Sequence, residues 1–174
     1  YKRFSIIFTL GLLQALVGWW MVKSGLSENP YVSPYRLTFH LSNAVIIYAL
    51  LLWTAIEYYH STSANFISFK SKNILIFISI ILVFITILSG GFMAGSHAGQ
   101  AFTSYPLMNV KCIPDDIYLE DLGFLNLFEN TVMINFNHRW IVTITFIFTF
   151  SFFSSLIFNI FINLSNLIIL SVLL

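Results

Sequence analysis

Residues 141–162 read IVTITFIFTFSFFSSLIFNIFI, an apolar run without a single charged side chain. A helix needs roughly 20 apolar residues to cross the hydrocarbon core of a bilayer, and backbone in lipid must form all its hydrogen bonds within the protein. We therefore predict an all-α, polytopic transmembrane helical bundle. Hydropathy indicates four full spans and the start of a fifth, at about 4–22, 37–58, 74–95, 135–160 and from Leu167.

The composition excludes a soluble globular domain. Of 174 residues, 58% are hydrophobic and 9% are charged, whereas a soluble domain carries about 25% charged residues. The net charge of +1 does not bear on nucleic-acid binding, but the sequence has no basic patch, so we expect no nucleic-acid partner. The chain begins without Met and stops inside an apolar run, so we expect a fragment of a longer membrane protein.

Charges outside the spans predict the orientation in the membrane. Basic residues precede the first and third spans, and the connection 96–134 is acidic. Because Lys and Arg favour the cytoplasmic side, the N-terminal end is expected there and the acidic connection outside. The second and fourth spans then both run inward, which places His40 and His138 at equivalent depths. The basic residues used here are Lys2, Arg3, Lys70 and Lys72.

The second span carries one polar stripe. Arg36, His40 and Asn43 follow one another at i, i+4 and i+7, so they share a helical face. Such a face must meet protein, a cofactor or water. His40 could ligate haem iron while Arg36 pairs with a haem propionate. The alternative is a histidine that bonds a neighbouring helix, with Arg36 reaching lipid headgroups.

The fourth span opens with a similar set. Asn135 and His138 share a face, and Arg139 is turned about 100° away from it. His138 could ligate a metal while Arg139 meets a propionate or headgroups; the alternative is a helix start with interfacial charges. The matching depth and histidine–arginine pairing of the two helices favour ligand roles for His40 and His138.

Small residues mark the end of the third span. Gly91, Gly95 and Gly99 recur every four residues and, if helical, form a smooth face. That face could pack against another helix or lie against a flat macrocycle, and the sequence leaves both open. His97 is expected in a loop or at a rim, and His60 and Glu57 at the inner interface. No hydrolase or nucleotide-binding motif is present.

Four stretches, in order, resemble haem A synthase of the mitochondrial and proteobacterial type. They cover most of residues 11 to 142 and read LQALVGWWMVKSGL, VSPYRLTFHLSNA, SGGFMAGSHAGQAFTSYPLMN and NLFENTVMINFNHRW. The resemblance implies an eight-helix protein made of two four-helix halves, each with a haem site between two histidines. Residues 1–70 would be the last two helices of the first half, and 71–174 the first helices of the second half, truncated.

By this resemblance His40 matches the fourth-helix histidine and His138 the sixth-helix histidine, so they belong to different haem sites. Their partner histidines, and the family's acidic residue, lie outside this chain; Glu57 does not match that residue. Ser96 and His97 stand where many members have a different pair. The single Cys112 cannot form the loop disulfide found in some relatives.

The implied reaction is oxidation of a methyl group of haem O to a formyl group, through successive hydroxylations. Haem O is the substrate of the first half and haem b the electron-transfer cofactor of the second. Haem O synthase is expected as substrate donor, together with an unidentified electron donor, the lipid bilayer and a homo-oligomer. The location would be the bacterial or mitochondrial inner membrane. The alternative function is a non-catalytic b-type cytochrome subunit.

Overall fold

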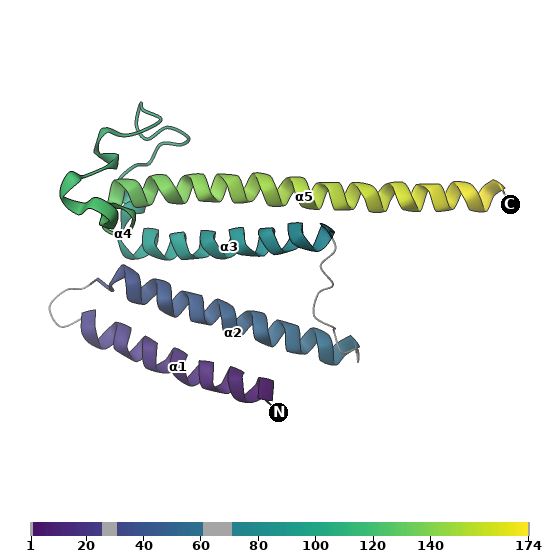
Figure 1. Cartoon of the computed structure of the whole chain (residues 1–174), viewed down its shortest axis with the longest axis horizontal. Coiled ribbons are helices and arrows are strands. Elements are labelled where there is room, and N and C mark those ends of the chain that lie inside the picture. The colour runs from purple at the N-terminus through teal and green to yellow at the C-terminus, as the bar shows by residue number, and fades with distance from the viewer. Residues whose placement is uncertain (1, 26–30, 61–70, 174) are drawn as a thin grey trace.

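The computed structural model describes residues 2–25, 31–60 and 71–173, and side chains of the last helix as far as Ile162. Four long helices dominate it (Figure 1). Each is long and apolar enough to cross a membrane, which confirms the predicted all-α polytopic bundle. They are α1 (Lys2–Gly25), α2 (Pro34–His60), α3 (Ser71–Gly95) and α5 (Thr131–Leu173).

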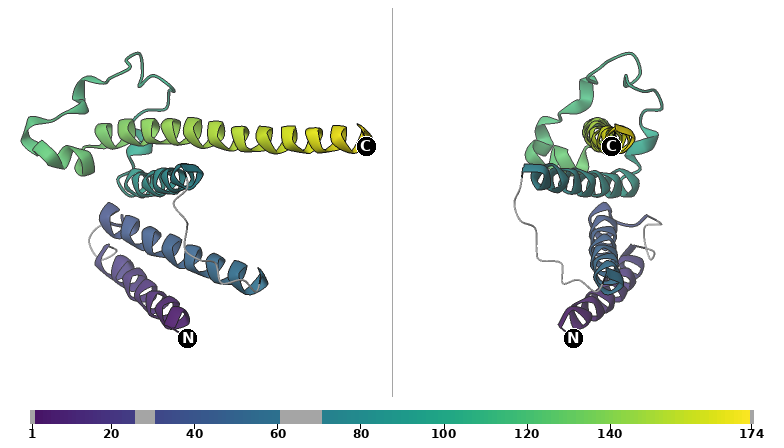
Figure 2. Two further views of the ribbon diagram at one scale, coloured as in Figure 1. Left: turned by 45° about the vertical axis from the view of Figure 1, so that its right-hand side comes forward. Right: turned by 90° about the vertical axis from the view of Figure 1, so that its right-hand side faces the viewer.

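The long helices lie side by side in the order α1, α2, α3, α5, so that α3 separates the hairpin α1–α2 from α5 (Figures 1 and 2). The N-terminal ends of α2 and α5 lie at the same end of the bundle. Most large apolar side chains on the spans are exposed, as expected for helices that face lipid rather than water.

Helices α2 and α5 both begin at residues that suit a helix start. Pro34 is the first residue of α2, where its missing N–H costs no hydrogen bond. Asn130 precedes α5, and its Oδ1 accepts hydrogen bonds from the backbone N–H groups of Val132 and Met133, at 2.9 and 3.4 Å. These bonds satisfy two of the donors that a helix N-terminus leaves unpaired.

The last helix differs from the sequence-based expectation. The prediction of a separate fifth span from Leu167 is wrong, because α5 continues as one helix to Leu173. The segment from 131 to 173 contains neither Gly nor Pro, so nothing in it breaks the helical hydrogen bonds. At 1.5 Å per residue α5 is about 64 Å long, roughly twice the hydrocarbon thickness.

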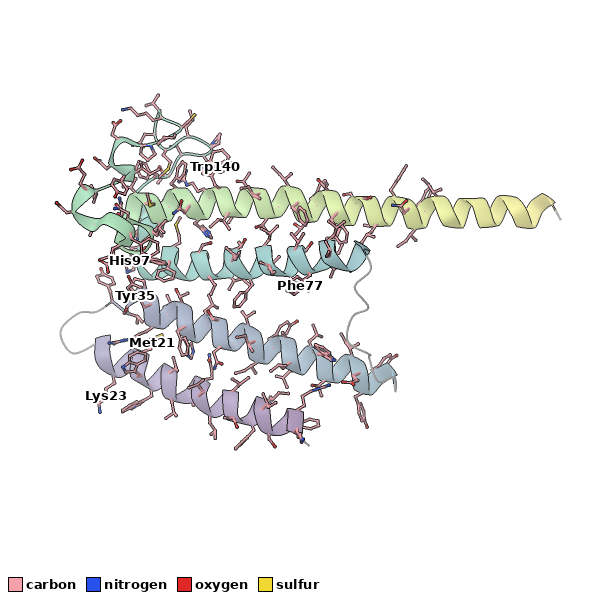
Figure 3. All side chains as sticks on the ribbon, viewed as in Figure 1. Met21, Lys23, Tyr35, Phe77, His97 and Trp140 are labelled. Carbon is pink, nitrogen blue, oxygen red and sulfur yellow. The ribbon has the colours of Figure 1, made fainter. Side chains whose placement is uncertain are left out.

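The connection between α3 and α5 forms an ordered cap over one end of the bundle (Figure 3). Asn126 is almost fully buried and donates to the carbonyls of Leu119 and Gly123, both at 2.7 Å. Asn135, fully buried, donates to the carbonyl of Ala98 at 2.6 Å. The Asn126 bonds therefore stabilise the fold of the connection itself, and the Asn135 bond holds it against α5. Its short helices are η1 (Ala98–Gln100), η2 (Asp115–Ile117), η3 (Glu120–Leu125) and α4 (Asn126–Glu129).

Candidate functional site

His40 faces α1, where it meets a polar side chain and a glycine. Gln14 Nε2 lies 3.0 Å from His40 Nε2 and donates to the His40 carbonyl at 3.1 Å. A Cβ at Gly18 would lie only 3.1 Å from His40 Cε1, so the missing side chain lets the imidazole approach the α1 backbone closely. His40 therefore occupies the α1–α2 interface, about two turns inside the start of α2.

Backbone carbonyls fix the direction of the hydrogen bonds around His40. Asn43 Nδ2 donates to the Leu10 carbonyl at 3.2 Å and to Gln14 Oε1 at 2.7 Å. A backbone carbonyl only accepts hydrogen bonds. The Leu10 carbonyl therefore orients the NH₂ group of Asn43, and the His40 carbonyl orients the NH₂ group of Gln14. Gln14 therefore presents an N–H to His40 Nε2, which must accept it.

The tautomer of His40 follows from this direction. A neutral imidazole that accepts at Nε2 carries its proton on Nδ1. That Nδ1 is buried and has no hydrogen-bond partner among the described residues. His40 thus has its Nε2 lone pair engaged by an amide and its Nδ1–H unsatisfied.

The polar stripe predicted on α2 shares one face, as its spacing indicated. Arg36 lies over the ring of Trp20, with 4.5 Å between Cζ and the ring centroid, and His40 and Asn43 meet Gln14. All three residues therefore face α1. Arg36 is one turn nearer the start of α2 than His40, with its charge stabilised by an aromatic face.

His138 faces α3 and has a different environment. Ser89 Oγ lies 2.8 Å from His138 Nδ1 and donates its own proton to the Thr86 carbonyl at 2.9 Å. A hydroxyl has one proton, so Ser89 accepts from the Nδ1–H of His138. Gly90 also lies beside this ring, since its Cβ would be 3.4 Å from Cε1. His138 Nε2 forms no hydrogen bond within the described part of the chain and keeps its lone pair.

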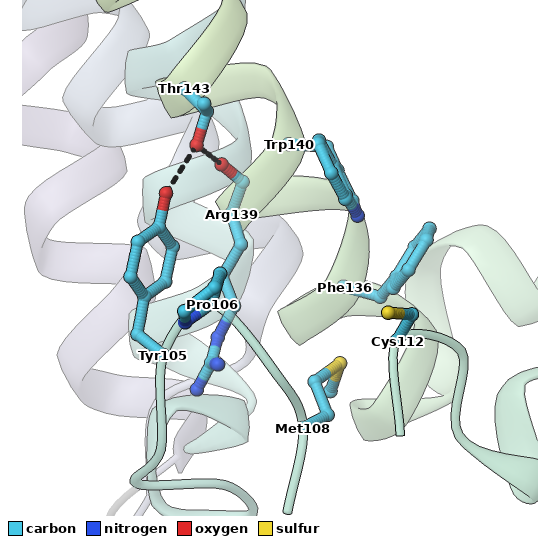
Figure 4. Close-up of a pocket in the computed structure, with 8 residues that line it drawn as sticks. All are labelled: Tyr105, Pro106, Met108, Cys112, Phe136, Arg139, Trp140 and Thr143. Atoms are coloured by element: carbon cyan, nitrogen blue, oxygen red, sulfur yellow. Dashed lines mark hydrogen bonds between the residues drawn. The ribbon is translucent and has the colours of Figure 1, made fainter. Parts of the chain in front are cut away.

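Arg139 points away from His138, as predicted, and binds the connection between α3 and α5. Its guanidinium donates to the carbonyl of Phe102 at 2.7 Å and to that of Ser104. Figure 4 shows Arg139 in a small pocket between this connection and α5, beside Tyr105 and Pro106, with Cys112 on the opposite side of the pocket. Two loop carbonyls thus hold the guanidinium, which ties the connection to the helix one residue from His138.

The three glycines of the predicted small-residue face do not share one environment. A Cβ at Gly91 would lie 2.7 Å from Thr38 Oγ1, and one at Gly95 would lie 2.6 Å from Pro34 Cα. Helix packing is the interpretation that fits these two positions, because α2 occupies the space that a macrocycle would need. Gly99 lies in η1, beyond the end of α3 at Gly95, so the three glycines do not form one helical face.

The remaining candidates lie away from both histidine sites. His97 is exposed and its ring meets that of Tyr31 edge-on, with centroids 4.5 Å apart (Figure 3 shows its position). Glu57 pairs with Arg3 at the opposite end of the bundle. The side chain of His60 lies outside the described residues. Within the described part of the chain, no group of three or more His, Cys, Asp or Glu residues could hold a metal ion.

Sequence reasoning missed Gln14, Gly18, Ser89 and Gly90. A signal for Gln14 exists, since it is the one amide in the apolar run from Phe4 to Val22, and such a group needs a partner. Its partner could be found only from the way α1 and α2 are aligned. Ser89 resembles many serines on membrane helices that bond their own backbone, so its contact with His138 required the structure.

Four apolar helices with two histidines at separate helix interfaces define an integral membrane protein with two candidate ligand sites. The chain belongs to the COX15–CtaA family of cytochrome oxidase assembly proteins, whose sequence pattern matches residues 1–173. This match confirms, at the level of the family, the resemblance that the ordered motifs predict.

Curated relatives give the same assignment. The protein named heme A synthase of Nitrosospira multiformis is 42% identical over 141 residues, which are 80% of this chain and 40% of that protein. Heme A synthase COX15 of Arabidopsis thaliana is 41% identical over 157 residues, 83% of this chain and 34% of that protein. The chain therefore spans less than half the length of these relatives. No solved structure matches it significantly.

Proposed function

We propose that the protein containing this chain is a haem A synthase, an oxidoreductase that converts a methyl group of haem O to a formyl group. The observation that carries the proposal is the pair of histidines at equivalent depths on α2 and α5, each at its own interface. Each has its proton on Nδ1, so Nε2 is the nitrogen that would bind iron; it is free in His138 and accepts a hydrogen bond from Gln14 in His40. Relatives named heme A synthase support the same assignment.

The proposal divides the chain into two parts. Residues 1–70 belong to the first four-helix half and contribute α1 and α2 with His40. Residues 71–174 belong to the second half and contribute α3 and α5 with His138. Contacts of Thr38 and Pro34 with α3 glycines support a close junction of the two halves. Residues 61–70, where the boundary falls, lie outside the described residues.

The residues at His138 fit a haem, and those at His40 fit one once the Gln14 amide gives up His40 Nε2. Gly18 and Gly90 leave the flank of each imidazole without a side chain, and His138 Nε2 has a free lone pair. Iron-ligating histidines usually donate the other ring N–H to an oxygen, as His138 does to Ser89. A porphyrin supplies four ligands itself, so a single histidine from this chain suffices on one side of the iron.

His138 is proposed to be an iron ligand that would hold haem b, with Ser89 fixing its ring orientation. His40 is proposed to ligate or position haem O, the substrate of the first half. Haem b, when bound, supplies one-electron transfer. Arg36 and Arg139 are proposed partners of the propionates: a guanidinium has five N–H donors, and loop carbonyls use only some of those of Arg139.

The membrane setting suits this chemistry. Haem O is strongly apolar, so helices in a bilayer can receive it directly from lipid or from haem O synthase, the proposed donor. We place the protein in a bacterial or mitochondrial inner membrane with the N-terminal end of the chain on the cytoplasmic or matrix side. An electron donor and assembly as a homo-oligomer belong to the same proposal.

Pigment analysis of the full-length protein tests the function. Haem extracted from the purified protein and separated by chromatography should contain haem b together with haem O or haem A. The alternative, a non-catalytic b-type cytochrome subunit, would yield haem b only. A haem-free preparation from haem-replete cells would exclude both functions and leave a structural or transport protein.

A further inference from the structure

The two histidine sites differ at the nitrogen that iron would bind. His138 is held at Nδ1 by Ser89, which leaves Nε2 free. His40 is held at Nε2 itself, because the Gln14 amide donates to that nitrogen at 3.0 Å. The neutral imidazole has one lone pair in the ring plane, so His40 cannot keep this hydrogen bond and ligate iron at once.

Resting on the proposed function, we propose that Gln14 is a positioning residue that competes with haem iron for His40 Nε2 and so makes ligation at the first site reversible. If haem iron took His40 Nε2 as a ligand, the Gln14 amide would lose that acceptor, and it would regain it when the product left. No proton moves, because His40 carries its proton on Nδ1 in both states.

Two further hydrogen bonds keep the Gln14 amide beside the His40 ring. Its other contacts, to the His40 carbonyl at 3.1 Å and from Asn43 at 2.7 Å, hold the amide beside the ring whether or not Nε2 accepts from it. The unpaired Nδ1–H of His40 acts in the same direction, since a histidine that donates no hydrogen bond is a weaker ligand. Both features oppose permanent ligation.

This difference matches the needs of the two sites. A substrate site must release its product in every cycle, whereas a resident cofactor must stay. The imidazole of His138, which Ser89 holds at Nδ1, suits a haem that stays bound. The imidazole of His40, whose Nε2 also accepts from Gln14, suits a haem that is exchanged in each cycle. If Gln14 were only a contact that joins α1 to α2, its loss would loosen the site and speed haem release.

The test compares two substitutions in the full-length protein loaded with haem O. Gln14→Leu removes the competing donor at similar volume, so transfer of haem O to apomyoglobin should slow by about threefold to tenfold, the value of one hydrogen bond. Gln14→Glu presents a carboxylate, which accepts from the ring and draws the proton to Nε2, so release should become faster. Gln14→Ala replaces Gln14→Leu where that variant does not accumulate in the membrane.

Thr9→Val is the matched control, since Thr9 lies on the same helix as Gln14 but is exposed and bonds the Ser5 carbonyl of its own helix, and it should not slow release. Release of haem O from Gln14→Leu at the wild-type rate or faster overturns the role of Gln14. If haem O binding by the wild-type protein does not depend on His40, the proposed function is overturned instead. The rate of haem b loss, measured in the same samples, should be unchanged in every variant.

Discussion

Ser89 Oγ accepts the Nδ1–H of His138 at 2.8 Å, and this bond joins α3 to α5 at the depth of the second candidate site. It sets the tautomer, since a proton held on Nδ1 leaves Nε2 with its lone pair. It also sets the ring orientation, because Ser89 is itself bonded to the Thr86 carbonyl. A serine in an apolar helix thereby determines which nitrogen of His138 can bind iron.

Ser89→Ala should therefore weaken haem b binding by about 10- to 100-fold, the usual cost of losing a group that orients a metal-binding histidine. The haem midpoint potential should rise, because an imidazole that donates no hydrogen bond is a poorer electron donor to iron. Haem b content and redox titration of the purified full-length protein measure both effects.

Ser79→Ala is the control for Ser89→Ala. Ser79 lies on the same helix and is buried, but its hydroxyl bonds only the Leu75 carbonyl of its own helix. Haem b content should not change, and Ser89→Thr, which keeps the hydroxyl, should restore part of the binding. Equal haem loss in Ser79→Ala and Ser89→Ala would mean that α3 packing, and not the bond to His138, is responsible.

Gly18→Ala should disturb the first site alone. The new Cβ would lie 3.1 Å from His40 Cε1, so the ring must move by a few tenths of an ångström and lose its alignment. Haem O retention should fall while haem b content stays constant. Gly11→Ala is a matched change on α1 with nothing within 4 Å of the new Cβ, and it should leave both haems in place. Loss of haem b in Gly18→Ala would contradict separate sites.

The sequence predicted more of the fold than of the contacts at the candidate site. Apolar runs located all four spans because membrane helices are specified by local composition, and spacing placed Arg36, His40 and Asn43 on one face. What that face meets depends on how α1 is aligned with α2, which no local pattern encodes. The end of α5 was mispredicted because polar residues near Asn163 resemble a loop, although without Gly or Pro they remain helical.

Gly91→Ala should destabilise the junction between α2 and α3. The added Cβ would lie 2.7 Å from Thr38 Oγ1 and 3.1 Å from Thr38 Cα, and the backbone atom cannot rotate away. Overpacking of this kind costs about 1–3 kcal/mol, so the unfolding temperature in detergent should fall. Gly99→Ala, whose Cβ would meet only Met93 Cε at 3.5 Å, should have little effect. Equal thermal stability of the two variants would argue against close α2–α3 packing.

Cys112 offers a test of orientation in the membrane. Its side chain is exposed and lies in the acidic connection that the charge pattern places outside. A membrane-impermeant maleimide should therefore label it in intact spheroplasts of a bacterial host and not in sealed inside-out vesicles. Cys112→Ser in the full-length protein shows which part of the labelling comes from this residue. Labelling of Cys112 in inside-out vesicles only would reverse the topology and would place His40 and His138 near the cytoplasmic surface.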